Sequence, residues 1–298
     1  MATRAELYAE QVTKLIDGAK NLSLEARTAI ESQLAQADRE ILGRIAQVDP
    51  KSFTAAQLTA LRTSIDQELA KFRVAATDKV NALQERAATM ATHDTSSVIG
   101  AAMGTSMPLG TVNMATVRIA QGYAADLISG LSSDAATKLK GVVQRAFLGG
   151  QSMSDIIAQV GRAMEGGKFS GIFTDVGDRA MKIAFNEILR IHSIAGQARM
   201  QDLASRNPAI QKRWRHIPAA RVPRIGHILA DNQTVAVDAP FIVEGEELMF
   251  PRDPSGSPEN TIFCHCVSVP FIADEDLHAT AEDRATLAKA GLSMPVTQ

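Results

Sequence analysis

This chain of 298 residues contains few cysteines and few aromatic residues, and its net charge is small. Two cysteines argue against the disulfide framework of a secreted protein, and they fit a reducing compartment such as a bacterial cytoplasm. The opening residues, "MATRAELYAEQVTKL", lack the apolar core of a signal peptide. A net charge of −2 does not indicate a nucleic-acid-binding protein. The length still allows two domains and a sizeable core.

Proline is nearly absent from the first two thirds of the chain. Only Pro50 and Pro108 precede residue 208, whereas nine prolines follow from Pro208 onward. Because proline is excluded from helix interiors, the first two thirds can be mostly helical and the last third cannot. Short runs rich in Val, Ile, Phe and Thr after Pro208 predict short strands separated by turns. We therefore predict an α+β protein, in which a long helical region precedes a compact domain of helices packed on a small β-sheet, followed by a C-terminal helix.

The helical region contains recognisable start signals. Ser23 is a candidate N-cap, and Ser133 and Ser152 are candidates for later helices. Thr54 and Gln57 have the spacing of a capping box, so we expect a helix to begin directly after Thr54.

Two apolar stripes recur at helical spacing. Such stripes need a partner, which is either the rest of a self-contained bundle or the surface of another protein. The two stripes consist of Ile30, Leu34, Ala37, Ile41, Ile45 and Val48, and of Leu61, Ile65, Leu69, Phe72, Ala76, Val80, Leu83 and Ala87.

A segment without charge, 95–117, separates the first helices from the rest. Its length is sufficient to span a bilayer, but its glycine, proline, serine and threonine content favours a flexible linker without stable membrane insertion. The predicted parts are a helical arm at 1–93, a linker at 94–117, a compact domain at 118–272 and a helical tail at 273–298.

Both cysteines lie in "NTIFCHCVSVPFI", at 260–272. On a strand, Cys264 and Cys266 point to the same face. We predict that both are small buried side chains without a metal, because free cysteine is among the most buried residue types. The alternative is a zinc site, whose ligands would be Cys264, Cys266, His227 and one of His216 and Asp231.

The order of motifs after residue 185 is distinctive. The chain contains "NEILRIHSIAGQAR", then "KRWRHI", then "RIGHILADNQTVAVDAPF" and finally "MFPRDPSGSPENTIFCHC". This order resembles the Mu-type minor head protein family of tailed phages, also called phage head morphogenesis proteins. The resemblance covers about residues 135–272. The matching residues are Glu187, Arg190, Trp214, Arg224, His227, Asp231, Gln233, Pro251, Asp253, Pro254, Asn260, Cys264 and Cys266.

Three positions depart from that family's pattern. Phe263 stands where the family usually has a second asparagine, and His265 where it usually has arginine. Asn232 replaces the glycine of a turn, although asparagine also tolerates the left-handed conformation. These departures weaken any polar role for the final motif.

The resemblance implies a structural protein without a cofactor rather than an enzyme. Such proteins are made in the host cytoplasm and are located in the virion, inside the capsid near the portal. The implied partners are the portal protein and the major capsid or scaffolding protein, during procapsid assembly and DNA packaging. Some members are ejected with the DNA.

If the resemblance holds, we expect the individual motif residues to stabilise the fold rather than to take part in chemistry. Glu187 and Arg190 can pair on one helix or reach the C-terminal sheet. Trp214 is expected to anchor that sheet, and His227, three residues after Arg224, is expected to be a hydrogen-bonded structural group.

A basic strip is a candidate contact for packaged DNA or the portal. Basic residues dominate between residues 199 and 227 and can bind phosphates without sequence preference. The alternative is a solvated face with ion pairs inside the chain. The candidate contacts are Arg206, Lys212, Arg213, Arg215 and Arg221.

An ADP-ribosyltransferase-like effector is the alternative enzyme hypothesis. The family's fold is suspected to be related to those enzymes, and Glu244-x-Glu246 resembles their Glu-x-Glu motif. An exposed turn also explains these two acidic residues. No Gly-x-Ser-x-Gly, Walker loop or His-Glu-x-x-His motif is present.

Overall fold

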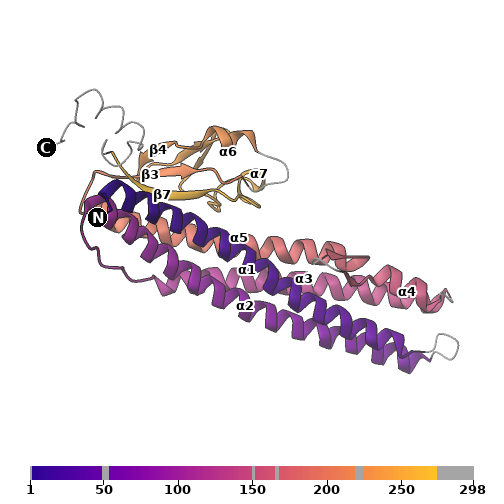
Figure 1. Cartoon of the computed structure of the whole chain (residues 1–298). Coiled ribbons are helices and arrows are strands. Elements are labelled where there is room, and N and C mark those ends of the chain that lie inside the picture. Colours follow the sequence, from indigo (N-terminus) through magenta and orange to yellow (C-terminus); the bar gives the residue numbers. More distant parts are fainter. Residues whose placement is uncertain (1, 49–53, 150–151, 165–167, 219–223, 274–298) are drawn as a thin grey trace, which may run out of the picture. The chain divides into compact units, whose positions relative to one another are not determined.

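The computed structural model describes residues 2–48, 54–149, 152–164, 168–218 and 224–273. It confirms the α+β class, because long helices precede small antiparallel sheets (Figure 1). The predicted C-terminal helix lies almost wholly outside the described residues. The helices are α1 (Arg4–Ala46), α2 (Ala55–Met103), α3 (Met114–Leu148), α4 (Met153–Val160), α5 (Ile172–Ala204), α6 (Ile225–Leu229) and α7 (Pro258–Thr261). The strands are β1 (Ala163–Met164), β2 (Lys168–Phe169), β3 (Ile210–Arg215), β4 (Thr234–Ala236), β5 (Phe241–Val243), β6 (Glu246–Leu248) and β7 (Val267–Ile272).

The chain forms two compact units that do not follow its linear order. The first unit consists of Met1–Leu22, Glu85–Met114 and Leu189–Gln298, and the second of Ser23–Gln84 and Ala115–Ile188. Helices α1, α2 and α5 each contribute to both units. The units therefore cut across the predicted arm and domain, because each long helix packs different parts of its length into different cores.

The second unit is a helical bundle with its own core. The two predicted stripes are buried within the chain from Ile30 to Ile45 and from Leu61 to Ala87. The self-contained interpretation is therefore confirmed, and presentation of these stripes to another protein is wrong. Ion pairs also connect helices at the surface of this bundle. Lys140 Nζ of α3, for example, lies 2.7 Å from Asp66 Oδ1 of α2, and such exposed pairs contribute little to stability.

The helix boundaries confirm some predicted caps and correct others. Thr54 and Gln57 form the capping box. The backbone N–H of Gln57 donates to Thr54 Oγ1 at 3.2 Å, and the backbone N–H of Thr54 donates to Gln57 Oε1 at 2.8 Å. Ser152 caps α4 in the same way with Asp155. Ser23 and Ser133, in contrast, lie inside α1 and α3. The buried positions of α1 continue at intervals of three and four through Leu15, Ala19, Leu22, Ala26 and Ile30, so packing overrides the local cap signal.

The predicted linker is mostly helical. Helix α2 runs to Met103, and only 104–113 lies outside regular structure before α3 begins. The polar composition did not prevent a helix, because the hydroxyls of Ser96 and Ser97 donate to carbonyls one turn back, and Val98 is fully buried. No helix among the described residues is both long and apolar enough to cross a membrane.

The first unit contains the main sheet, in the order β4-β3-β7, and a β5–β6 hairpin. All pairs are antiparallel, with Trp214 of β3 opposite Ser268 of β7. The Tyr8 hydroxyl of α1 donates to the Pro270 carbonyl of β7 at 3.0 Å, so the start of the chain helps to hold the sheet. Trp214 lies in a core with both cysteines; its other members are Ala230, Phe241, Val243 and Leu248.

Two glycines of the second unit give opposite predictions. Gly161 has φ +91°, and a Cβ there would lie 1.7 Å from the Ser170 carbonyl oxygen, so Gly161→Ala should lower the free energy of unfolding by about 3 kcal/mol. Gly43 lies inside α1 with open space around it, so Gly43→Ala should raise that free energy by about 0.5–1 kcal/mol. Urea unfolding followed by helical circular dichroism measures both. Equal effects of the two substitutions would contradict the backbone assignment.

Candidate metal centre

Both cysteines lie just before β7 rather than on it. Strand β7 begins at Val267, which corrects the prediction that Cys264 and Cys266 are strand residues. The reason is Arg252, whose Nη1 donates to the carbonyls of Cys264 at 2.5 Å and Cys266 at 2.8 Å. These carbonyls are thus bonded to a side chain instead of a neighbouring strand. Burial is confirmed, since each cysteine is 1% exposed.

His227 brings its imidazole to both sulfur atoms. Its Nδ1 lies 3.5 Å from Cys264 Sγ and 3.4 Å from Cys266 Sγ. Its Nε2 lies 3.2 Å from Asn260 Oδ1, which only accepts hydrogen bonds, so Nε2 carries the proton. In the neutral ring Nδ1 is therefore bare and faces the sulfurs. The predicted hydrogen bonding of His227 is confirmed.

A second histidine borders the same cluster. His216 follows the last residue of β3, and its Nδ1 lies 3.7 Å from Cys266 Sγ. The Asp231 carboxylate accepts the His216 backbone N–H at 2.8 Å, which fixes this end of β3. Asp231 is thus occupied with backbone, and His216 is the better candidate for a fourth ligand.

The potential ligand atoms of His227, Cys264 and Cys266 lie within 4.8 Å of one another, and all three residues are buried. Trp214 closes one side, with its ring edge-on to His227 at a centroid distance of 5.9 Å. Two sulfurs and imidazole nitrogen are donors that zinc prefers. The set can therefore hold a metal ion or hydrogen-bond within itself.

Charge around the cysteines favours an ionised sulfur. Burial opposes ionisation of Cys264, but the hydrogen bond from Cys266 and the charge of Arg252 outweigh it and hold the pKa of this thiol well below its usual range. The hydrogen bond to Cys264, together with burial, raises the pKa of the Cys266 thiol. The guanidinium of Arg252 that supplies this charge is itself fully buried, with 0% of its residue exposed.

Because of His192, which lies on α5, we expect the stability of the first unit to depend on pH. Burial, with a smaller contribution from the charge of Arg252, lowers its pKa to about 3. The unfolded chain therefore takes up the proton first as pH falls, so stability present above the ordinary pKa of about 6.5 is lost towards pH 3. Between pH 7 and pH 4 this loss should be roughly 3 kcal/mol, and His192→Leu should remove it.

Urea unfolding followed by the fluorescence of Trp214, the single tryptophan of the chain, measures this dependence. The variant should lose less stability than the wild type over the same pH interval. Parallel curves for the two proteins would show that His192 does not titrate as expected.

The other motif residues connect to this core at several points. Arg190 donates from Nε to the Arg252 carbonyl at 3.3 Å, which is the predicted link from α5 to the C-terminal segment. Arg224 donates to the Ile262 carbonyl at 2.5 Å. Glu187 belongs to the second unit, where its carbonyl accepts from Gln84 at 3.4 Å.

Arg252 was not predicted from the sequence. It lies between Pro251 and Asp253 in a proline-rich loop, where a surface arginine is the ordinary expectation. A charged residue directly between two family-matching positions was the available signal.

The basic strip does not form one surface. Lys212 is fully buried and donates to the Met249 carbonyl at 2.6 Å, so its predicted contact with DNA or a portal is wrong. The guanidinium carbon of Arg213 lies 3.6 Å from the centroid of the Phe271 ring, and Arg215 Nε lies 3.3 Å from Asp231 Oδ1. Arg206 is exposed and pairs with Asp202, whereas Arg221 lies outside the described residues. The alternative of internal partners therefore describes most of this strip.

The Glu-x-Glu sequence forms a tight turn with structural contacts. Glu244 and Gly245 have φ +51° and +83° and connect β5 to β6. Glu244 Oε1 accepts from the Gly226 amide at 3.0 Å, and Glu246 Oε2 accepts from the Ser257 amide at 2.9 Å. The exposed-turn interpretation is confirmed for Glu244, whereas Glu246 is the half-buried first residue of β6. The two carboxylates bind the backbone at the start of α6 and just before α7.

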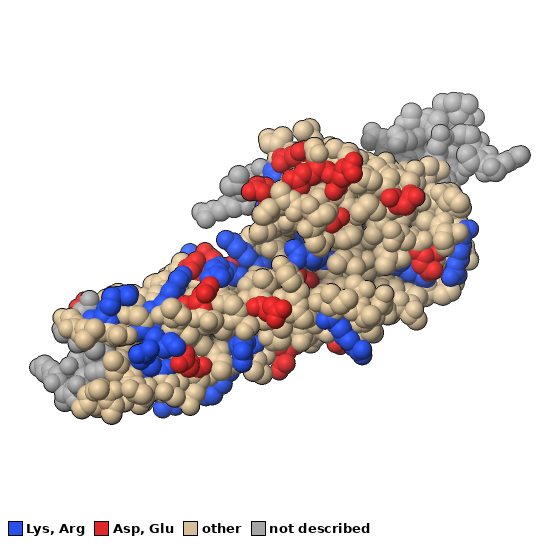
Figure 2. Space-filling model, turned by 180° about the vertical axis from the view of Figure 1, so that it is seen from behind, with Lys and Arg blue, Asp and Glu red and all other residues tan. Residues whose placement is uncertain are grey.

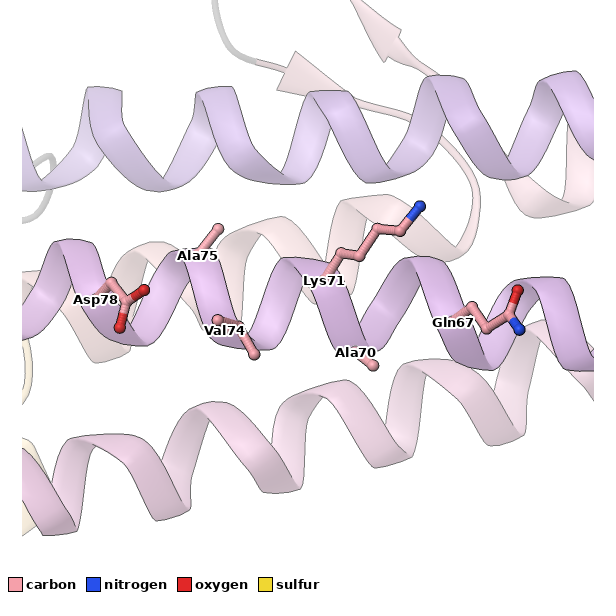
Figure 3. Close-up of a pocket in the computed structure, with 6 residues that line it drawn as sticks. All are labelled: Gln67, Ala70, Lys71, Val74, Ala75 and Asp78. Carbon is pink, nitrogen blue, oxygen red and sulfur yellow. The ribbon is translucent and has the colours of Figure 1, made fainter.

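A shallow groove of about 600 Å³ follows one face of α2 in the second unit (Figure 3). Lys71 at this groove pairs with Glu68 at 2.9 Å. The groove offers an outer helix face rather than a cluster of chemically reactive groups. Its lining consists of Gln67, Ala70, Lys71, Val74, Ala75 and Asp78.

Comparison with known proteins gives a partial relative. No family model and no solved structure matches the chain. It is similar to the protein YqbB of Bacillus subtilis (strain 168), whose description is "uncharacterized", with 32% identity over 120 residues. The matched region is 39% of this chain and 38% of YqbB. This likeness concerns part of each protein and assigns no activity.

Proposed function

We propose that this chain is a structural protein of a tailed-phage head, bound at the portal inside the capsid and acting in procapsid assembly and DNA packaging. The observation that carries the proposal is the meeting of the family-matching residues in one buried core. Trp214, His227, Asn260, Cys264 and Cys266 are each at most 2% exposed and contact one another in sequence-distant pairs. Residues that build a core this way support an architectural motif shared with minor head proteins.

Charged groups in and around the motif are used inside the protein, which favours binding over catalysis. Arg252 and Arg224 donate to carbonyls, and Glu244 and Glu246 accept from backbone amides. The transferase alternative therefore rests on a sequence likeness whose two carboxylates already have structural partners.

An exposed apolar patch provides a surface for a protein partner. On α6, Ile225 is 68% exposed, Ile228 43% and Leu229 78%. Arg224 ties the start of this helix to Ile262, which is also exposed, as is Phe263. Exposed apolar side chains gathered on one short helix and the adjoining loop are typical of protein interaction sites.

The charge around this patch favours protein over DNA. Apart from Arg224 at the start of α6 and the buried Arg252, all charged residues between 224 and 273 are acidic. Figure 2 shows several Asp and Glu side chains gathered on one part of the first unit. An excess of acidic residues repels phosphates, so we propose the portal or capsid contact on α6 and any DNA contact elsewhere.

Co-purification with the portal ring of the same phage tests this proposal. The tagged full-length chain should retain the ring, and Leu229→Glu or Ile225→Glu should reduce the retained portal at least tenfold, because a charge enters an apolar contact. Leu148→Glu is the matched control, since Leu148 is 81% exposed but belongs to the second unit.

Failure of the wild-type chain to retain the portal would overturn the head-protein proposal. Retention unaffected by both α6 variants would remove the docking surface from it. NAD turnover that Glu246→Ala abolishes would replace the proposal with the transferase alternative.

A further inference from the structure

We propose that His216, His227, Cys264 and Cys266 bind one structural Zn²⁺ ion. The proposal goes beyond the head-protein function and holds whatever the partner of the chain is. It replaces the expectation that the two cysteines are buried without a metal.

Three sulfur–nitrogen separations match those of a tetrahedral site. Zinc binds sulfur at about 2.3 Å and imidazole nitrogen at about 2.0–2.1 Å, so a tetrahedron places sulfur and nitrogen about 3.6 Å apart. The corresponding separations are 3.5 Å from Cys264 to His227, 3.4 Å from Cys266 to His227 and 3.7 Å from Cys266 to His216. The side chains of His227, Cys264 and Cys266 therefore surround a point at the correct distance for one ion. His216 lies at this distance from Cys266 alone and outside the group whose ligand atoms are all within 4.8 Å of one another, so its side chain would move towards the ion to become the fourth ligand.

Hydrogen bonding within the cluster explains this arrangement less well. His227 Nδ1 has one lone pair in the ring plane, yet two sulfurs approach it at nearly equal distances. Its other nitrogen is held by Asn260. A cation shared by all the ligands satisfies both sulfurs and the bare nitrogen together.

The surroundings supply the support that metal ligands require. Asn260 fixes the tautomer and orientation of His227, as outer partners of zinc-bound histidines do. Arg252 holds the two cysteine carbonyls, and its Nη2 donates to Ser193 on α5 at 2.7 Å. Buried Trp214 and Phe241 form an apolar wall, so His227 and the two cysteines are held in place before an ion arrives.

Ligand chemistry and charge also balance. Two thiolates neutralise Zn²⁺ and two neutral imidazoles complete the coordination, while any proton on a thiol passes to solvent on binding. Four protein ligands leave no open position, which is the pattern of a structural rather than a catalytic zinc site. The ion would join the end of β3, helix α6 and the connection before β7, which are distant in sequence.

Metal analysis of the full-length chain tests the inference. Protein expressed with supplemental zinc should contain about one zinc per chain, and Cys264→Ser or His227→Ala should reduce this content at least fivefold. His265→Ala is the matched control, because His265 lies between the cysteines in the sequence but is not one of the four proposed ligands, and it should retain the ion. The proposal would be overturned if the folded wild-type protein contained no bound zinc after dialysis against a zinc-containing buffer.

A second measurement uses the wild-type chain alone, so it does not require that any variant folds. Replacing zinc with Co²⁺ in the wild-type chain should give the intense visible and near-ultraviolet absorption of tetrahedral thiolate coordination, and a chelator should abolish it. Absorption typical of Co²⁺ in water alone would overturn the site. His216→Ala should speed zinc extraction by a chelator, and an unchanged rate would remove His216 from the ligand set.

Discussion

Replacing Arg252 with methionine is expected to lower the free energy of unfolding of the first unit by about 3 kcal/mol. The guanidinium is fully buried and satisfies the Cys264 and Cys266 carbonyls and the Ser193 hydroxyl. Methionine fills much of the same space but leaves these acceptors unpaired, and each unpaired buried group costs about 1–3 kcal/mol. Relief from burying a charge offsets part of that loss.

Urea unfolding followed by Trp214 fluorescence measures the effect of Arg252→Met. Arg206→Met is the control, because Arg206 is exposed and makes a surface ion pair, so its effect should stay within about 0.5 kcal/mol. If both variants unfold at the same urea concentration, Arg252 is not the central clamp of this unit.

Replacing Trp214 with alanine is expected to cost about 3–5 kcal/mol, as truncation of a large buried aromatic side chain does. Its ring is fully buried and lies edge-on to both His227 and Phe241, at centroid distances of 5.9 and 5.3 Å. The cavity would also free the His227 ring from one side. Thermal unfolding followed by circular dichroism measures the loss.

Ile242→Ala is the matched control for Trp214→Ala. Ile242 is adjacent to Phe241 in β5 but is 49% exposed, so its truncation should cost less than about 1 kcal/mol. A similarly small cost at Trp214 would mean that the packing around the cysteines is loose.

The sequence predicted the elements better than their ends. Periodicity identified the bundle stripes, and the Thr54 and Ser152 caps could be predicted because their hydrogen bonds are local. The length of α2 could not, since the buried contacts that carry it through 95–103 come from distant segments. One example is Ser96, whose hydroxyl accepts from Arg199 Nε at 2.8 Å.

The candidate site was predicted in composition but not in arrangement. His227 and the cysteines were recognised as a possible set, whereas the clamp by Arg252 and the tautomer set by Asn260 depend on tertiary contacts. The burial of Lys212 was predictable: it lies two residues before Trp214 on β3, and alternate strand residues share a face. Grouping the basic residues by sequence position alone hid this alternation.

X-ray absorption at the zinc edge of the purified full-length chain tests most directly whether His216, His227, Cys264 and Cys266 converge on one ion. The expected spectrum has two sulfur neighbours at about 2.3 Å and two imidazole nitrogens at about 2.0–2.1 Å. A first shell made only of oxygen and nitrogen, with no sulfur, would contradict the account.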